Sequence, residues 1–279
     1  PNEIISTKFV YKQKPSLKKA RCVARGFMQD IAETGDVYSP VVRPETVRTL
    51  LAFSAAQRRS VLQLDVEGAY TKAPITGKPI YVSPPSKDHS KAGHVLRLRR
   101  SIYGLRSSGK AWYETLRTYL LSQGLHPSKA DPCLFHNSAR TMHIAVFVDD
   151  LLVSSVHASD GERFFENINK HKTGTSPWKV RNLGRPTNFL GLEIRWNRFG
   201  VKLTHTKMIE RLVERSVLSP VDPQALTKLE EEMTAEGLSA IEKLGQNGSV
   251  AGKHAFVRLL GQDVPLEIEY TDTVEIESL

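Results

Sequence analysis

The sequence predicts an α+β fold in which mainly antiparallel strands form a sheet with helices on one side. Three observations lead to this prediction. Apolar and polar residues alternate in short segments, which is the period of a half-buried strand. Other segments carry apolar residues at helical spacing. The stretch HIAVFVDDLLVSSV, residues 143–156, has two apolar arms around a pair of aspartates, which is typical of a hairpin.

Each element follows from its own pattern. In VLQLDVEGAY, residues 61–70, Leu62 and Leu64 face one side of a strand while Gln63 and Asp65 face the other. The other expected strands are at 19–27, 78–85, 94–105, 133–137 and 188–196. The expected helices are at 45–57, 108–124, 159–168 and 204–216.

The charge is divided unevenly along the chain. The 279 residues include 39 Lys and Arg against 30 Asp and Glu, a net charge of +9. Residues 221–279 hold 4 basic and 12 acidic residues, so residues 1–220 hold 35 basic and 18 acidic ones. A body this basic indicates a polyanionic partner such as nucleic acid, although a basic surface also serves solubility. The length allows one large domain or two modest ones.

No segment of the sequence indicates a membrane-bound or a secreted protein. No apolar run reaches the ~18 residues that a bilayer-spanning helix needs. The first residues lack the pattern of a signal peptide. The two cysteines, Cys22 and Cys133, form neither a disulfide framework nor a zinc ligand set. We therefore expect an intracellular protein that is not secreted and has no membrane partner.

Asp149 and Asp150 are the first candidates for chemistry. Carboxylates are unfavourable inside a buried strand unless a cation meets them, so we expect the hairpin to present them at its tip. Taken alone, the pair is also consistent with a solvated turn. Asp65, however, follows another short strand, and two such strands side by side would gather three carboxylates. Oxygen ligands suit Mg²⁺, and two ions about 4 Å apart stabilise the attacking and leaving oxygens of phosphoryl transfer. Together with the basic body, these acids predict a nucleic-acid polymerase or nuclease.

Seven segments resemble, in order and spacing, the reverse transcriptases of copia-type LTR retrotransposons. They are KARCVARGF (19–27), YSPVVRPETVRTLLAFSA (38–55), QLDVEGAY (63–70), SIYGLRSSGKAWY (101–113), ADPCLF (130–135), VFVDDLLV (146–153) and NLGRPTNFLGLEI (182–194). The resemblance implies a right-hand polymerase fold with an antiparallel palm sheet backed by helices. It places fingers and palm in residues 1–200, the start of a partial thumb in 201–220 and a divergent acidic tail in 221–279. It also leads us to expect a fragment or truncated copy of a Pol polyprotein.

The resemblance implies roles for the acids. Asp65, Asp149 and Asp150 match the catalytic acids of the palm, which hold two Mg²⁺ or Mn²⁺ ions. The backbone carbonyl of Val66 is implied as a further metal ligand. Lys179 is a candidate general acid for the leaving pyrophosphate.

The resemblance also implies a nucleotide site and a primer grip. Arg21 and Lys19 fall in the segment that binds the triphosphate, with a solvated basic face as the alternative for both. Tyr70 matches the aromatic residue that excludes a 2′-hydroxyl, with a core tyrosine as the alternative. Ser107 departs from the family, which usually has Gln there, and the loss of one contact of ~1–2 kcal/mol would impair nucleotide selection. The implied primer grip is a hairpin that contains Phe189, Leu190 and Gly191.

The leading hypothesis is an RNA-directed DNA polymerase that adds deoxynucleotides to a primer 3′-hydroxyl by two-metal phosphoryl transfer. The expected partners are an RNA or DNA template–primer, deoxynucleoside triphosphates and other domains of the Pol polyprotein. The expected location is the cytoplasm, in a virus-like particle, or the nucleus. The alternative is a catalytically inactive, retrotransposon-derived remnant that binds nucleic acid. A soluble phosphohydrolase would explain the acids but not the basic body.

Overall fold

The computed structural model describes residues 4–14, 17–30, 35–85, 95–198, 200–206, 209, 255–259 and 262–266. The chain divides into two compact units, Pro1–Pro186 and Thr187–Leu279, and each is described by itself. The helix expected at 204–216 lies almost entirely outside the described residues, as does most of the expected acidic tail. The domain limits expected at residues 200 and 220 stay predictions.

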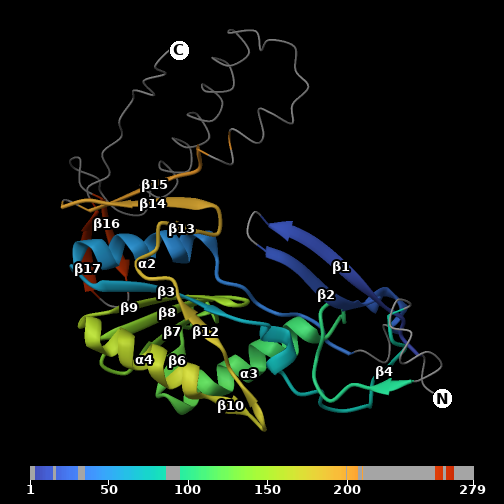
Figure 1. Cartoon of the computed structure of the whole chain (residues 1–279). Helices are drawn as coiled ribbons and strands as arrows, with labels where there is room; N and C mark the ends of the chain where they lie inside the picture. Colours follow the sequence, from blue (N-terminus) through green and yellow to red (C-terminus); the bar gives the residue numbers. More distant parts are fainter. Residues whose placement is uncertain are drawn as a thin grey trace, which may run out of the picture. The chain divides into compact units, whose positions relative to one another are not determined.

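A six-stranded antiparallel sheet forms the centre of the first unit (Figure 1). This confirms the predicted α+β class with an antiparallel sheet. In spatial order, the strands are β12 (Val180–Asn182), β3 (Ser60–Val66), β9 (Asp150–Ser155), β8 (Met142–Phe147), β7 (Leu134–Asn137) and β6 (Leu125–Pro127). The accompanying helices are α2 (Pro44–Ala56), α3 (Ser108–Ser122) and α4 (Ala158–Lys170), with 3-10 turns η1 (Gly26–Met28) and η2 (Ala69–Lys72).

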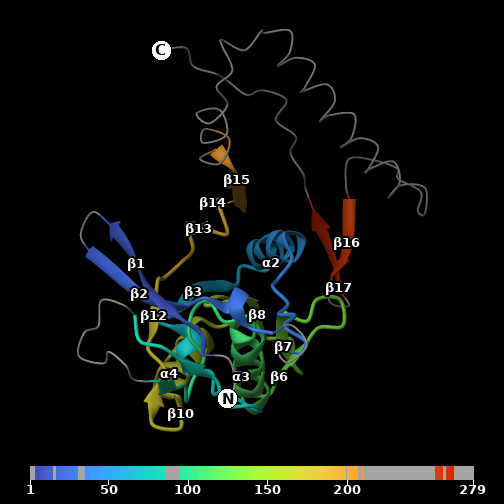
Figure 2. The ribbon, with the colours of Figure 1, turned by 90° about the vertical axis from the view of Figure 1, so that its right-hand side faces the viewer.

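Helices lie on both faces of this sheet, so the expectation that they cover only one side is wrong. The hydroxyl of Ser54 in α2 is 2.7 Å from that of Ser154 in β9. A Cβ at Gly161 of α4 would contact Leu62, which points from β3 to the opposite face. Figures 1 and 2 both show α3 and α4 on the side of the sheet away from α2. The reason is that α2 has a buried apolar stripe of its own, which also needs a sheet face to cover it.

A basic hairpin and two short strand pairs complete the described part of the first unit. The hairpin consists of β1 (Thr7–Lys14) and β2 (Leu17–Ala24), and its register places Lys19 and Arg21 on the same face. Phe9 and Tyr11 occupy the other face, where their ring centroids are 6.1 Å apart. The short strands are β4 (Tyr81–Val82), β5 (Leu96–Arg97), β10 (Lys172–Thr173) and β11 (Ser176–Pro177).

The described part of the second unit contains two small antiparallel sheets. The strand-like segment at 188–196 is divided by a turn at Leu190 and Gly191, both with positive φ, because a two-residue hairpin turn requires that conformation. The hairpin that the resemblance implied for these residues is therefore present. The strands are β13 (Asn188–Phe189), β14 (Leu192–Trp196), β15 (Val201–Thr204), β16 (Ala255–Leu259) and β17 (Gln262–Leu266). In the described part of the chain, no helix is both long and apolar enough to span a bilayer.

His143 is a polar residue in the core of the first unit. It is fully buried in β8, and its ring meets the Phe53 ring edge-on at 5.6 Å. Neither of its ring nitrogens has a hydrogen-bond partner among the described residues. Burial, and then the charge of Arg59, lower the pKa of His143 to about 3. The fold therefore accepts the neutral imidazole only.

Acid should destabilise the protein through His143. An unfolded histidine binds its proton near pH 6.5, whereas the folded one does so near pH 3, so stability falls as the pH drops through that interval. The loss approaches about 1.4 kcal/mol per pH unit. We expect His143→Leu to reduce this slope in urea unfolding curves recorded between pH 7 and 4.5. The control is Ile144→Val, at the buried neighbour in β8, which removes no titratable group and should keep the wild-type slope.

Candidate functional site

The register between β3 and β9 places two carboxylates directly opposite each other. Asp65 pairs with Asp150, and Phe147 pairs with Asp150 on its other side. Directly paired residues of antiparallel strands point to the same face. Asp65 and Asp150 therefore share one face at the end of the sheet, as the sequence predicted for neighbouring strands that each end in acid.

The turn between β8 and β9 consists of Val148 and Asp149. The predicted hairpin is confirmed, with Asp149 at its tip and Asp150 as the first residue of the returning strand. The backbone N–H of Val66 donates to the carbonyl of Asp149 at 2.8 Å, which fixes the tip against β3. This bond uses the N–H of Val66; the role of its carbonyl as a metal ligand stays a prediction.

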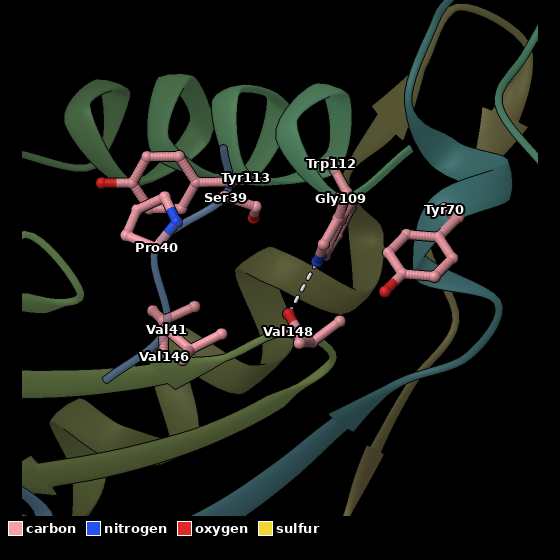
Figure 3. Close-up of a pocket in the computed structure, with 9 residues that line it drawn as sticks. All are labelled: Ser39, Pro40, Val41, Tyr70, Gly109, Trp112, Tyr113, Val146 and Val148. Carbon is pink, nitrogen blue, oxygen red and sulfur yellow. Dashed lines mark hydrogen bonds between the residues drawn. The ribbon is translucent and has the colours of Figure 1, made fainter. Parts of the chain in front are cut away.

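Val148 adopts a strained conformation at this tip. Its φ is +53°, which is unfavourable for a β-branched residue by roughly 1–2 kcal/mol. The indole N–H of Trp112, from α3, donates to the Val148 carbonyl at 2.6 Å, as Figure 3 shows. Hydrogen bonds from α3 and β3 thus hold the turn in a backbone conformation that is unfavourable for Val148 itself.

The three acids influence one another electrostatically. Burial raises the pKa of Asp149, and the charge of Asp65 raises it further. Burial, then the charges of Asp149 and Asp65, raise the pKa of Asp150 to about 6, although a hydrogen bond from Gln63 opposes this shift. Burial and the neighbouring acids therefore disfavour the charged forms of Asp149 and Asp150.

Arg181 neutralises part of that charge, at Asp65. It lies opposite Asp65 in the β12–β3 pair, and its guanidinium contacts the Asp65 carboxylate at 2.8 and 3.1 Å and Glu67 at 3.3 Å. Within the described ranges, no group of three or more Asp, Glu, His or Cys side chains is arranged to hold a metal ion. The expected gathering of these three carboxylates around metal ions stays a prediction.

Basic residues of the β1–β2 hairpin and the aromatic residue Tyr70 of η2 lie near the acids. The charges of Arg21 and Lys19, both in β2, lower the pKa of Asp149, so they lie within electrostatic reach of it. The Arg21 guanidinium carbon is 5.3 Å from the centre of the Tyr103 ring. That ring meets the ring of Tyr70 at 5.0 Å and 65°.

A pocket of about 200 Å³ lies between the tip and α3 (Figure 3). Tyr70 and Val148 stand at one side of it, and Gly109 and Trp112 of α3 line another. Its remaining lining residues are Ser39, Pro40, Val41, Tyr113 and Val146. The pocket therefore adjoins the tip and the ring expected to exclude a 2′-hydroxyl.

The other predicted residues are placed as follows. Ser107 is the N-cap residue of α3, and its carbonyl accepts the N–H of Ala111. In the second unit, Phe189 ends β13 and is buried, while Leu190 and Gly191 form the turn. Their roles as nucleotide contact and primer grip stay predictions.

Arg181 and Tyr103 are two residues of this site to which sequence reasoning assigned no role. Arg181 belongs to WKVRNLG, where Lys179 was the candidate instead; the backbone carbonyl of Lys179 accepts the N–H of Glu67. Alternation in this segment would have put Arg181 on the face opposite the buried Val180. Tyr103 belongs to SIYGL, where an aromatic residue before a glycine was the available signal.

The shifted pKa of Asp150 makes a stability prediction. Because the folded pKa is about 6 and the ordinary value is 3.8, the fold disfavours the charged form, and stability is lost as the pH rises from about 4 to 6. We expect Asp150→Asn to be more stable than the wild type at pH 8, by on the order of 1–2 kcal/mol after solvent screening, and to lose this advantage near pH 4. Urea unfolding in EDTA measures the difference.

Asp36→Asn is the matched control. Lys110, at 2.9 Å, lowers the pKa of Asp36, so its charged form is favoured in the fold. This variant should gain no stability at pH 8. An Asp150→Asn variant that is no more stable than Asp36→Asn at pH 8 would show that burial and the neighbouring acids do not disfavour the charged form of Asp150.

Comparison with known proteins agrees with the family that the sequence resembles. The model of the family described as reverse transcriptase (RNA-dependent DNA polymerase) matches residues 1–229. The truncated transposon Ty1-A Gag-Pol polyprotein of Saccharomyces cerevisiae is 33% identical over 207 residues, covering 71% of this chain and 17% of the relative. The transposon Ty1-DR4 Gag-Pol polyprotein of the same yeast is 32% identical over 226 residues, covering 76% and 14%. This chain thus spans less than a fifth of the length of these curated relatives.

Two solved structures are also similar. The apo telomerase of Candida tropicalis, truncated from its C-terminal domain, has a TM-score of 0.41 and 11% identity, covering 73% of this chain and 56% of that one. The telomerase of Candida albicans in complex with a fragment of telomeric RNA has a TM-score of 0.40 and 11% identity, covering 73% and 46%. The match of the family model to most of the chain and the identity with the Ty1 polyproteins show that this chain belongs to the reverse transcriptase (RNA-dependent DNA polymerase) family.

Proposed function

We propose that this chain catalyses RNA-directed DNA synthesis, the template-dependent addition of deoxynucleotides to a primer 3′-hydroxyl. One observation carries the proposal: Asp65, Asp149 and Asp150 interact at one end of the sheet, within electrostatic reach of Arg21 and Lys19. Negative charge that can bind cations, next to basic residues that can bind phosphates, suits phosphoryl transfer. Membership of the reverse transcriptase family supports the same reaction.

The acids offer a suitable donor set for Mg²⁺ or Mn²⁺. Every donor is an oxygen, which hard divalent cations prefer. Burial and the charges of neighbouring acids raise the pKa values of Asp149 and Asp150, so their charged forms are disfavoured in the fold, and bound cations would stabilise them. Asp65, Asp149, Asp150 and the Val66 carbonyl would hold two ions, with Asp65 released from Arg181. Bound there, the ions would favour ionisation of the primer hydroxyl and stabilise the leaving pyrophosphate.

The chain's own residues would bind and select the nucleotide. Arg21 and Lys19 would bind the triphosphate, because guanidinium and ammonium groups pair with phosphate oxygens. Tyr70 would exclude a 2′-hydroxyl by steric overlap. Ser107 would contact the nucleotide with one hydroxyl, where the family usually supplies an amide.

The remaining parts of the proposal concern the nucleic acid and the cell. The turn at Leu190 and Gly191, after Phe189, would hold the primer strand, because a glycine at φ +84° lets another backbone approach closely. The partners would be an RNA or DNA template–primer and other domains of a Pol polyprotein. We place this activity inside the cell, in the cytoplasm, in a virus-like particle, or in the nucleus.

Primer extension tests the proposal directly. Purified chain with Mg²⁺ should extend oligo-dT on poly-rA, and EDTA should stop the reaction. Asp149→Asn should reduce the rate by roughly a thousandfold, because the amide cannot replace a charged metal ligand. The rate is measured from radiolabelled dTTP incorporation.

Asp160→Asn is the matched control for that experiment. Asp160 lies in α4, which covers the face of the sheet opposite the acids, so this variant should extend primers at the wild-type rate. Folded wild-type chain that binds poly-rA/oligo-dT in a salt-dependent manner without extending it would reject the polymerase and favour the inactive remnant.

A further inference from the structure

We propose that Tyr103 is a positioning residue that holds the ring of Tyr70 in place and thereby sets how strongly the enzyme selects deoxynucleotides over ribonucleotides. The proposal rests on the proposed polymerase function and on Tyr70 as the residue that excludes a 2′-hydroxyl. It gives a role to the contact between Tyr103 and Tyr70, in which Tyr103 supports the ring that would meet the nucleotide.

The ring of Tyr103 is in contact on two sides. Tyr70 meets it at 5.0 Å in a tilted, edge-on arrangement, which is a favourable geometry for an aromatic pair. Arg21 lies over it at 5.3 Å, in the range of a cation–π contact. Tyr103 therefore stands between the residue proposed to bind the triphosphate and the residue proposed to select the sugar.

The backbone of Tyr103 is fastened to the end of β2. Its carbonyl accepts the N–H of Ala24 at 2.8 Å, and it forms a parallel bridge with Val23. The next residue, Gly104, has φ +91°, and a Cβ there would overlap the carbonyl oxygen of Ala24. The Arg106 guanidinium also donates to the Gly26 carbonyl at 2.9 Å. The position of the Tyr103 ring is thus set by the strand that carries Arg21.

Steric selection depends on how firmly the selecting ring is held. A ring that can move aside accepts a 2′-hydroxyl at little cost, whereas a ring packed against a fixed neighbour cannot. Tyr70 is half-buried and follows Gly68 in the short turn η2, so its own element is a limited support. Tyr103 supplies an aromatic surface from a second, independently anchored loop.

The test compares two substitutions at Tyr103 in the full chain. Tyr103→Leu removes the ring, and Tyr103→Phe keeps the ring but removes the hydroxyl. We measure kcat and KM for dTTP and for the ribonucleotide with the same base, on poly-rA/oligo-dT. We expect Tyr103→Leu to lower the dTTP preference by about tenfold, mainly through a lower KM for the ribonucleotide. Tyr103→Phe also removes the interaction of the hydroxyl with Arg21, which would affect both nucleotides alike, so its dTTP preference should stay within about twofold of the wild type.

A double-mutant cycle shows whether Tyr103 acts through Tyr70. Tyr70→Ala should lower the preference more than Tyr103→Leu does. In the Tyr70→Ala background, adding Tyr103→Leu should change the preference no further, because the ring that it positions is gone. Gly104→Ala should lower the preference like Tyr103→Leu, whereas Gly77→Ala should not, since Gly77 also has positive φ but a Cβ there meets nothing within 4 Å among the described residues.

Nucleotide binding to the chain with a chain-terminated primer distinguishes failure of the Tyr103 role from failure of the proposed polymerase function. The affinities for dTTP and for the ribonucleotide are measured in this complex, where no chemistry occurs, and circular dichroism checks that each variant folds. Three results would each overturn the role of Tyr103 alone. They are a wild-type dTTP preference in Tyr103→Leu, additive effects on that preference in the cycle, and a Tyr103→Phe variant that loses as much of the preference as Tyr103→Leu. A folded wild type that neither extends the primer nor binds either nucleotide would overturn the proposed function and this role with it.

Discussion

The register that places Asp65 opposite Asp150 is the constraint on which the rest of the site depends. Once β3 and β9 are paired in this way, two like charges share one end of the sheet, and the tip of the hairpin adds Asp149. Three features of the surrounding structure partly stabilise this negative charge. Arg181 pairs with Asp65, Gln63 donates to Asp150, and the basic strand β2 lies within electrostatic reach.

The sheet strands and their acids could be predicted because the sequence pattern that specifies each strand lies within the strand itself. Alternating residues in 61–66 and two apolar arms around 149–150 specify strands and a hairpin without reference to distant parts of the chain. The position of α2 could not be read in the same way. An apolar stripe shows that a helix needs a sheet face to cover it, but not which face that is.

The partners of the acids were harder to predict because they come from far along the chain. Arg181 lies in a strand of three residues, which is too short for alternation to be convincing, and it meets Asp65 only through the order of strands in the sheet. Tyr103 contacts Tyr70 and Arg21 from a third segment, and that contact depends on the close approach of Gly104 to Ala24. Sequence spacing carries no information about such encounters.

The strained tip has a consequence for how copies of a retroelement decay. Trp112 and Val66 hold the turn that contains the unfavourable Val148 backbone from two sides, and neither of them is an acid. Random substitution in an unselected copy would reach such supporting positions as readily as the acids themselves. A count of intact aspartates is therefore a poor guide to whether an inherited copy still works, and the indole at position 112 should be inspected with them.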